Sequence, residues 1–286
     1  MSNLTVRVLF ALIAIPATFL LLWLNDISRL ALMCFLSGAG AWEWARMASK
    51  MYKGPSMQVV APIASAVLVA AWAFQSGHFL GMAPVPHLVG LVFVAVFVAY
   101  IIIAFAKVSI EHLFPWLVMQ LGAPLYLGLW GGLEVFLLGS GNFSIEHSYK
   151  FIIVMSAMWV CDTMAYFGGR FLGKHKLATE ISPKKTVEGA IGGVAGDIVF
   201  CLLFTYAFSA VMQLSVNWIS LCIFLPIGAV ASIFGDLCAS IIKRQFGIKD
   251  YGNIMPGHGG VMDRFDSWAF VAPLLYIWNI YLPFIG

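Results

Sequence analysis

Nine long apolar segments constrain the fold of this chain more than any other feature of its sequence. They lie at residues 6–24, 29–45, 58–75, 87–106, 116–139, 151–169, 187–210, 217–239 and 266–284. An α-helix needs about 20 residues to cross a bilayer, and the segments have about this length. They lack the strict alternation of apolar and polar residues that a membrane β-barrel requires. The sequence therefore predicts an all-α, polytopic integral membrane protein with about nine transmembrane helices.

The distribution of basic residues predicts the orientation of these helices. Charged residues make up only 10% of the chain, whereas a soluble domain carries about 25%. Fourteen of the sixteen Lys and Arg residues fall on one side when the nine segments are threaded across a membrane, and only Arg29 and Lys150 fall on the other. By the positive-inside rule, the rich side and the N-terminus are cytoplasmic. The first apolar run is too long for a secretory signal, so we expect it to remain as the first helix.

The two halves of the chain differ in how much chemistry they carry. Residues 1–150 consist of apolar segments and short loops, which suggests a scaffold, and residues 151–286 hold the polar clusters. In the first half, Glu43 lies one turn from Arg46, and the favoured interpretation is an ion pair between them. Glu134 lies deeper in an apolar segment and is a weak functional candidate, since a lone buried carboxylate is costly. The five cysteines fall inside predicted helices without a CxxC pair, so we interpret them as packing residues.

The first polar cluster of the second half is a stripe along one predicted helix. Asp162, Tyr166 and Arg170 are spaced by four residues and share one face. Two readings are equally compatible with this spacing: a functional stripe that runs into the membrane, or an internal salt bridge to Arg170.

The second cluster has the residue types of a phosphate site. Ser182 stands at a predicted N-cap, Pro183 at the first helical position, and Lys184 and Lys185 follow. Free backbone N–H groups, the positive end of the helix dipole and two lysines would together hold a phosphate. Anchoring of the lysines at the membrane surface is the alternative. Farther along, four glycines share one helix face, which indicates close packing against another helix: Gly189, Gly192, Gly193 and Gly196. Asp197 is a candidate for a supporting role behind the site.

The third cluster runs from the eighth apolar segment to the ninth. Asp236, Ser240, Lys243 and Arg244 share one predicted helix face, and a loop with Lys249 and the sequence PGHGG (residues 256–260) follows. Asp263 and Asp266 then lie three residues apart, where we expect the last helix to begin. Carboxylates from two adjacent helix ends, at positions 236, 263 and 266, can surround a hard cation such as Mg²⁺. The basic residues of the cluster would neutralise phosphates, and the glycines at 259 and 260 would let the backbone approach a ligand.

These parts predict phosphoryl or nucleotidyl transfer, in which catalysis is mostly positioning and charge neutralisation. The sequence contains no Walker A motif and no Rossmann fingerprint. A nucleotide would therefore bind at the cytoplasmic ends of the helices, and the membrane setting suggests a lipid as the second substrate. We expect no nucleic-acid partner.

Residues 240–266 resemble the signature of a known family. The pattern comprises Ser240-x-x-Lys243-Arg244, Lys249-Asp250-x-Gly252, Pro256-x-His258-Gly259-Gly260 and Asp263-Arg264-x-Asp266. It closely resembles that of phosphatidate cytidylyltransferases, also called CDP-diacylglycerol synthases, with Met255 as a mild departure from the usual Leu, Ile or Phe. The segments DTMAYFGGR, GKHKL and ISPKKTVEG look like other blocks of that family, so the resemblance covers most of residues 150–286.

The resemblance implies a reaction and roles for the residues. CTP and phosphatidate would give CDP-diacylglycerol and pyrophosphate, with a Mg²⁺ requirement, a second cation and a homodimer among the further implications. Asp236 and Asp263 would be metal ligands, with Asp266 beside them, and the site would face the cytoplasm at a bacterial inner membrane. The residues that would act on the phosphates are Ser182, Lys184, Lys185, Ser240, Lys243, Arg244, Lys249, His258, Gly259, Gly260 and Arg264.

Two other functions remain open from the residues alone. A transporter would use Glu134, Asp162 and Asp197 as an ion path, but it predicts matching interrupted helices in both halves, which the sequence lacks. Another lipid-directed enzyme, such as a polyprenol kinase, would share the metal and phosphate chemistry. Release of pyrophosphate from CTP that depends on phosphatidate separates these from a cytidylyltransferase.

Overall fold

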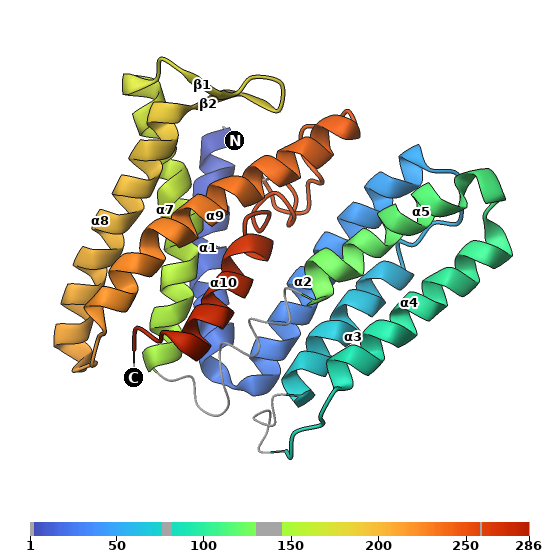
Figure 1. Cartoon of the computed structure of the whole chain (residues 1–286), viewed down its shortest axis with the longest axis horizontal. Coiled ribbons are helices and arrows are strands. Elements are labelled where there is room, and N and C mark those ends of the chain that lie inside the picture. Colours follow the sequence, from blue (N-terminus) through green and yellow to red (C-terminus); the bar gives the residue numbers. More distant parts are fainter. Residues whose placement is uncertain (1–2, 76–81, 130–144, 258, 286) are drawn as a thin grey trace. The chain divides into compact units, whose positions relative to one another are not determined.

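The computed structural model describes residues 3–75, 82–129, 145–257 and 259–285, and these residues are mostly helical (Figure 1). The chain forms two compact units. The first comprises Met1–Phe143 and Phe246–Phe265, and the second comprises Ser144–Gln245 and Asp266–Gly286. The second half of the sequence is thus shared between the units, because the segment Phe246–Phe265 packs with the N-terminal helices. The role of residues 1–150 as a scaffold stays a prediction.

The described helices coincide with the predicted apolar segments. The first unit contains α1 (Asn3–Leu24), α2 (Asp26–Met51), α3 (Val60–Gln75), α4 (Leu88–Lys107), α5 (Ile110–Ala123) and the π-helical turn η2 (Pro124–Leu129). The second contains α7 (Ile145–Leu172), β1 (Lys176–Ala178), β2 (Ser182–Thr186), α8 (Val187–Met212), α9 (Trp218–Gln245) and α10 (Trp268–Tyr281). Residues 130–139 of the fifth predicted segment lie outside the described residues.

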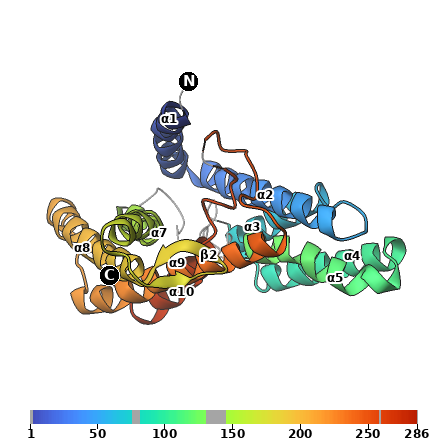
Figure 2. The same cartoon turned by 90° about the horizontal axis from the view of Figure 1, so that it is seen from above.

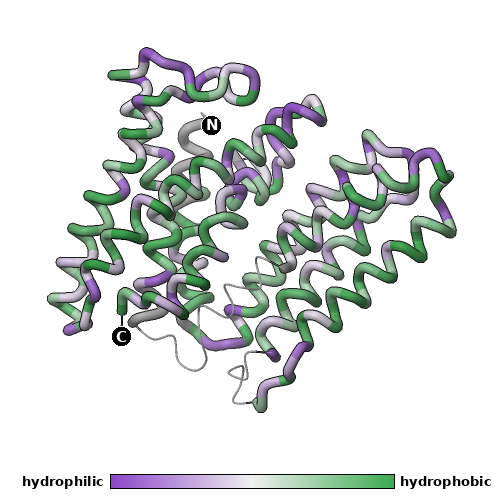
Figure 3. The backbone as a smooth tube through the Cα atoms, in the orientation of Figure 1, coloured by the Kyte–Doolittle hydropathy of each residue, from purple (hydrophilic) through white to green (hydrophobic). Residues whose placement is uncertain are grey.

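Hydropathy identifies the protein as an integral membrane protein. Apolar residues cover the helices, and polar residues gather at their ends and along the β1–β2 hairpin (Figure 3). Within the described residues, four helical stretches are long and apolar enough to cross a membrane: Leu88–Lys107, Tyr149–Leu172, Val187–Met212 and Trp218–Gln245. The predicted helical membrane fold is therefore confirmed, and the number of about nine crossings stays a prediction.

Close helix contacts define the first unit. Helix α3 packs against α2, α4 and η2, and α4 packs against α5 (Figure 2). A side chain at Gly128 of η2 would lie 2.8 Å from the Cα atom of Ser65, so only glycine permits this approach to α3. Trp116, Tyr100 and Leu68 are fully buried in this unit. In a lipid environment, the close van der Waals packing of such side chains stabilises the contacts between the helices.

The glycine face of α8 packs on α7, as the sequence predicts. A Cβ atom at Gly189 would lie 2.7 Å from the carbonyl oxygen of Ala165, and one at Gly193 would lie 2.8 Å from that of Cys161. Figure 1 shows the two helices side by side, with the β1–β2 hairpin at one end. All five cysteines are free; Cys161 and Cys201 are buried, as expected for packing residues, whereas Cys222 is exposed.

The predicted start of α8 is wrong. Ser182 is not an N-cap: it begins strand β2, in which Ser182 pairs with Ala178 and Thr186 pairs with Lys176. Thr186 is the N-cap instead, and its side chain accepts a hydrogen bond from the backbone N–H of Gly189 at 3.1 Å. The physical reason is the hairpin, whose ladder fixes the residues before Thr186 in extended backbone, so Lys184 precedes the first turn of α8.

Candidate functional site

The β1–β2 hairpin of the second unit is tied to the first turn of α8. The Glu188 carboxylate accepts hydrogen bonds from the backbone N–H groups of Lys174 at 3.0 Å and His175 at 3.1 Å. His175 Nδ1 also lies 2.6 Å from Glu188 Oε1. An acidic side chain is favoured at this position because it faces the positive end of the helix dipole. These contacts fix the base of the hairpin that carries the two lysines of the predicted phosphate site.

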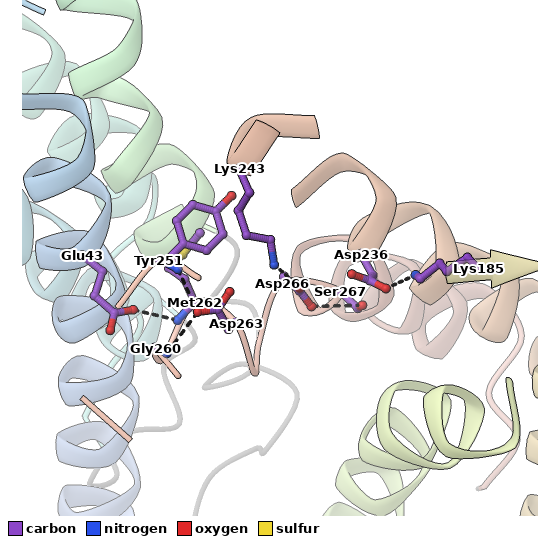
Figure 4. Close-up of polar contacts among 10 residues, drawn as sticks. All are labelled: Glu43, Lys185, Asp236, Lys243, Tyr251, Gly260, Met262, Asp263, Asp266 and Ser267. Carbon is purple, nitrogen blue, oxygen red and sulfur yellow. Dashed lines mark hydrogen bonds and ion pairs between the residues drawn. The ribbon is translucent and has the colours of Figure 1, made fainter. Parts of the chain in front are cut away.

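Lys185 reaches from the hairpin to α9, where it forms an ion pair with Asp236 (Figure 4). The two side chains are 28% and 18% exposed, so the pair is largely withdrawn from water. Burial lowers the pKa of the Lys185 ammonium, and the nearby carboxylates of Asp162 and Asp266 act in the opposite direction. Lys184 is exposed on the same strand. The two lysines therefore differ: one is held by carboxylates and the other faces outward.

The C-terminal end of α9 carries further charged contacts in the same unit. Lys243 Nζ lies 3.7 Å from Asp266 Oδ2, and both side chains are 11% exposed. Arg244 donates from Nε to the carbonyl oxygen of Ile181 at 3.1 Å, which joins the end of α9 to the hairpin. Ser240 is buried, at 7% exposure. The structure thus brings residues of the second and third polar clusters together through Lys185 and Arg244.

In the first unit, the segment Phe246–Phe265, called here the signature loop, folds around the carboxylate of Asp263. Asp263 Oδ2 accepts a hydrogen bond from the backbone N–H of Tyr251 at 2.8 Å and another from that of Gly260 at 3.0 Å (Figure 4). Gly259 has a φ of +89°, which favours glycine, and its carbonyl oxygen accepts from the N–H of Met255 at 2.9 Å. The loop therefore holds one carboxylate oxygen in a fixed position.

Asp263 and Asp266 do not begin the last helix, contrary to the prediction. The N–H of Arg264 donates to the carbonyl oxygen of Val261 at 3.0 Å, which closes a turn, and α10 begins only at Trp268. The turn is stabilised by the hydrogen bond from Gly260 to Asp263, which competes with a helix at this position. The two carboxylates belong to different units, with Asp263 in the first and Asp266 in the second.

Glu43 of α2 is a residue of the site that the sequence reasoning misassigned. It does not pair with Arg46 among the described residues: Arg46 lies over the ring of Trp42, 5.3 Å from its centre. Glu43 is fully buried and accepts a hydrogen bond from the backbone N–H of Met262, in the signature loop, at 3.0 Å. A glutamate inside an apolar segment was the available signal, and its distant partner is not visible in the sequence.

The remaining predicted residues are placed as follows. Lys249 and Arg264 are exposed in the signature loop, whereas His258 and Glu134 lie outside the described residues. On α7, Tyr166 accepts a hydrogen bond from Arg170 at 3.1 Å, so these two residues share a face as predicted. Asp197 is fully buried in α8 and accepts from the thiol of Cys201 at 3.6 Å.

The donor atoms suit a hard cation, although no group of three or more His, Cys, Asp or Glu side chains that could hold a metal occurs among the residues that the structure describes. Mg²⁺ binds through one or two carboxylates and completes its shell with water and substrate phosphates, so it does not need a cage of protein ligands. Asp236 and Asp266 each face a lysine ammonium, which offsets their negative charge. Each of Asp236, Asp263 and Asp266 offers the carboxylate oxygen that Mg²⁺ prefers, and their role as metal ligands stays a prediction.

Comparison with known proteins places these residues in a broader context. The sequence model of a family described as "Cytidylyltransferase family" matches residues 5–282. The chain is 42% identical over 129 residues to the phosphatidate cytidylyltransferase of Thermotoga maritima, an alignment that covers 44% of this chain and 47% of that protein. It is 49% identical over 119 residues to the Bacillus subtilis protein of the same name, covering 42% of this chain and 43% of that protein. The phosphatidate cytidylyltransferase of Staphylococcus saprophyticus is 47% identical over 136 residues, which are 46% of this chain and 49% of the relative. The chain therefore spans about half the length of the curated relatives it matches.

Proposed function

The chain belongs to the cytidylyltransferase family, and we propose that it transfers the cytidylyl group of CTP to phosphatidate, giving CDP-diacylglycerol and pyrophosphate. The observation that carries this proposal is the family match over residues 5–282, because it includes every residue of the candidate site. The names of the three relatives specify phosphatidate as the acceptor. The membrane fold is consistent with a lipid acceptor.

The reaction needs no nucleophilic side chain. An oxygen of the phosphatidate phosphate attacks the α-phosphorus of CTP, and a new P–O bond forms. The bond between the α-phosphorus and the oxygen that leads to the β-phosphate breaks, and pyrophosphate leaves with that electron pair. A phosphate monoester is already an anionic nucleophile near neutral pH. The protein therefore has to align the reactants and reduce the repulsion between two anions.

The chain supplies positively charged side chains for this task. Lys184, Lys185, Lys243, Arg244 and Arg264 would neutralise the phosphates, as the resemblance implies. A lysine that carries a phosphate contact must remain protonated; burial lowers the pKa of Lys185, and the carboxylates of Asp162 and Asp266 counteract this. Arg244 already holds the hairpin through Ile181, so it would also keep Lys184 and Lys185 near the end of α9. His258 would orient or protonate a phosphate.

Asp236, Asp263 and Asp266 would hold Mg²⁺ together with phosphate oxygens of the nucleotide. When bound, Mg²⁺ supplies neutralisation of the charge on the phosphates. A second cation is part of the same proposal. The two hydrogen bonds on Asp263 Oδ2 keep this side chain oriented before any ligand arrives. Such preorganisation lowers the cost of assembling the site.

The setting of the enzyme is also part of the proposal. We propose that all nine apolar helices cross the membrane, that the N-terminus is cytoplasmic, and that the site faces the cytoplasm at a bacterial inner membrane. The asymmetric distribution of Lys and Arg supports this orientation. The family resemblance supports a homodimer.

The test is pyrophosphate release from CTP by the detergent-purified protein. Release should require phosphatidate and Mg²⁺ and should stop when a chelator is added. Asp236→Asn should lose most of this activity, whereas Glu111→Gln, which changes a carboxylate that is 73% exposed at the start of α5, should retain it. Release of CDP or ADP with a polyprenol would instead identify a kinase. No release with any phosphatidate, from protein that is folded, would refute the proposed function.

A further inference from the structure

The signature loop is attached to α2 through two consecutive residues. Trp44 stacks on Tyr251 with ring centres 6.5 Å apart and an angle of 10° between the planes. The Trp44 indole Nε1 donates to the carbonyl oxygen of Met119 in α5 at 2.7 Å, so the ring is also held by a second helix. The neighbouring Glu43 accepts from the N–H of Met262. Both ends of the folded part of the loop thus rest on the same turn of α2.

The glycines of the loop show how closely its backbone approaches the Glu43 carboxylate. A Cβ atom at Gly260 would lie 2.5 Å from Glu43 Oε2 and 2.6 Å from Oε1. A Cβ atom at Gly252 would overlap the same carboxylate. Any larger residue at these positions would therefore displace either the loop or Glu43. The two glycines and the glutamate form one packed arrangement, in which the backbone wraps the carboxylate.

This arrangement acts on Asp263 through short backbone links. Met262, which donates to Glu43, directly precedes Asp263 in the chain, and Gly260, which packs on Glu43, donates to Asp263 Oδ2 at 3.0 Å. Glu43 itself is fully buried, and its carboxylate faces the backbone of the loop. Its effect on a reaction at Asp263 must be indirect.

We propose that Glu43 is a positioning residue that fixes the signature loop, and through it the Asp263 carboxylate, by accepting the Met262 N–H at the correct distance. The property that matters is the length of the side chain, which brings its acceptor oxygen within hydrogen-bonding distance of the Met262 N–H. Its charge is secondary. The catalytic consequence rests on the proposed function, because it requires Asp263 to bind the metal and nucleotide. The anchoring of the loop does not depend on that function.

Three substitutions separate the effect of side-chain length from the effect of charge at position 43. Glu43→Gln keeps an acceptor oxygen at the same distance and removes the charge. Glu43→Asp keeps the charge and withdraws the carboxylate by one methylene, which takes it out of hydrogen-bonding range of the Met262 N–H. Glu43→Ala removes both. Glu111→Gln makes the same chemical change at an exposed site in the same unit and serves as the matched control.

The first measurement is amide hydrogen exchange of residues 251–263 in the complete protein in detergent, without CTP or metal. We expect the exchange rate of this segment to rise about 10- to 100-fold in Glu43→Asp and Glu43→Ala, which lose the hydrogen bond. In Glu43→Gln, where a neutral acceptor replaces a charged one on a single hydrogen bond, it should rise only about 5-fold, and in the control it should not change. Exchange elsewhere in α2–α5 should change little in the Asp and Gln variants. If Glu43→Ala fails to fold, the contrast between Asp and Gln still decides the result.

The second measurement is steady-state kinetics at several Mg²⁺ concentrations. The Asp variant should raise the KM for CTP, and the Mg²⁺ needed for half-maximal rate, by about 10-fold or more, and the Gln variant should stay within about 3-fold of the wild type. A Gln variant with fast exchange, or an Asp variant that behaves like the wild type, would overturn the proposal. If the variants show the expected changes in exchange but the wild type never releases pyrophosphate, the anchoring stands and only the proposed function is refuted.

Discussion

Asp263→Asn separates the structural role of this side chain from its proposed role as a metal ligand. In the folded loop, Oδ2 accepts two backbone hydrogen bonds, at 2.8 Å from Tyr251 and at 3.0 Å from Gly260. An asparagine can place its carbonyl oxygen at the same position and accept both. What it loses is the negative charge. Asp263→Ala loses the charge and both hydrogen bonds.

The expected magnitudes follow from these two contacts. A hydrogen bond to a charged acceptor contributes about 1.5–3 kcal/mol and a neutral one about 0.5–1.5 kcal/mol. Asparagine therefore weakens the loop by about 2 kcal/mol, which corresponds to an increase of about 30-fold in amide exchange at Tyr251 and Gly260. Alanine removes about 3–6 kcal/mol, so exchange should rise by more than about 100-fold, up to the limit set by global unfolding.

Activity should respond differently from exchange. Loss of a ligand charge lowers both metal affinity and rate, so we expect kcat/KM for CTP to fall about 100-fold or more in Asp263→Asn, with partial recovery at high Mg²⁺. The assay is pyrophosphate release over a Mg²⁺ titration, run beside exchange measurements on the same samples. Near-normal activity of the asparagine variant at low Mg²⁺ would refute the ligand role. Equal exchange in the asparagine and alanine variants would refute the hydrogen-bond argument.

Three further predictions concern the second unit, and each is measured as thermal unfolding in detergent. Gly193→Ala should lower the free energy of unfolding by about 1–3 kcal/mol, because the new Cβ atom would lie 2.8 Å from a backbone carbonyl oxygen of α7. In Gly192→Ala the nearest neighbour of the Cβ atom would lie at 3.4 Å, so the free energy of unfolding should stay the same or rise by up to about 1 kcal/mol. Equal stability of the two variants would contradict the packing argument. Lys185→Met should lower the midpoint more than Lys184→Met, since only Lys185 pairs with a largely buried carboxylate, and the reverse order would be inconsistent with that pair. Thr186→Ala should cost about 1 kcal/mol and Thr186→Ser almost nothing, since serine keeps the cap; a loss in both would point to the methyl group instead.

The positions of the helices could be predicted because the signal is local. A run of apolar residues about as long as a bilayer is thick has few folded alternatives, and the predicted segments coincide with helices wherever the structure describes them. The glycine face of α8 was predictable for the same reason. The spacing of the four glycines shows that one face of the helix has no side chains, and such a face predicts close packing on another helix, which is α7.

The start of α8 and the partner of Glu43 were harder to predict because pairing with distant residues decides them. Locally, Ser182 and Pro183 read as a helix start, but the ladder with Lys176 and Ala178 makes this segment a strand. The sequence offers Arg46 as a local partner for Glu43, yet the hydrogen bond of Glu43 comes from Met262, which is 219 residues away. A buried carboxylate takes the nearest backbone donors that the tertiary fold offers, and no helical periodicity contains that information.

The structure also changes how the positive charge of the site should be counted. From the sequence, each lysine and arginine near the proposed phosphates adds one positive charge. In the second unit, however, Lys185 faces Asp236 and Lys243 faces Asp266, so much of that charge is already balanced by carboxylates. A phosphate that reaches these lysines must compete with the aspartates, unless a cation occupies the aspartates first. Cation and nucleotide would then each favour the binding of the other, and by linkage this coupling has the same size in both directions. A requirement for a divalent cation would then have two causes, the pairing of the lysines with aspartates and the charge on CTP.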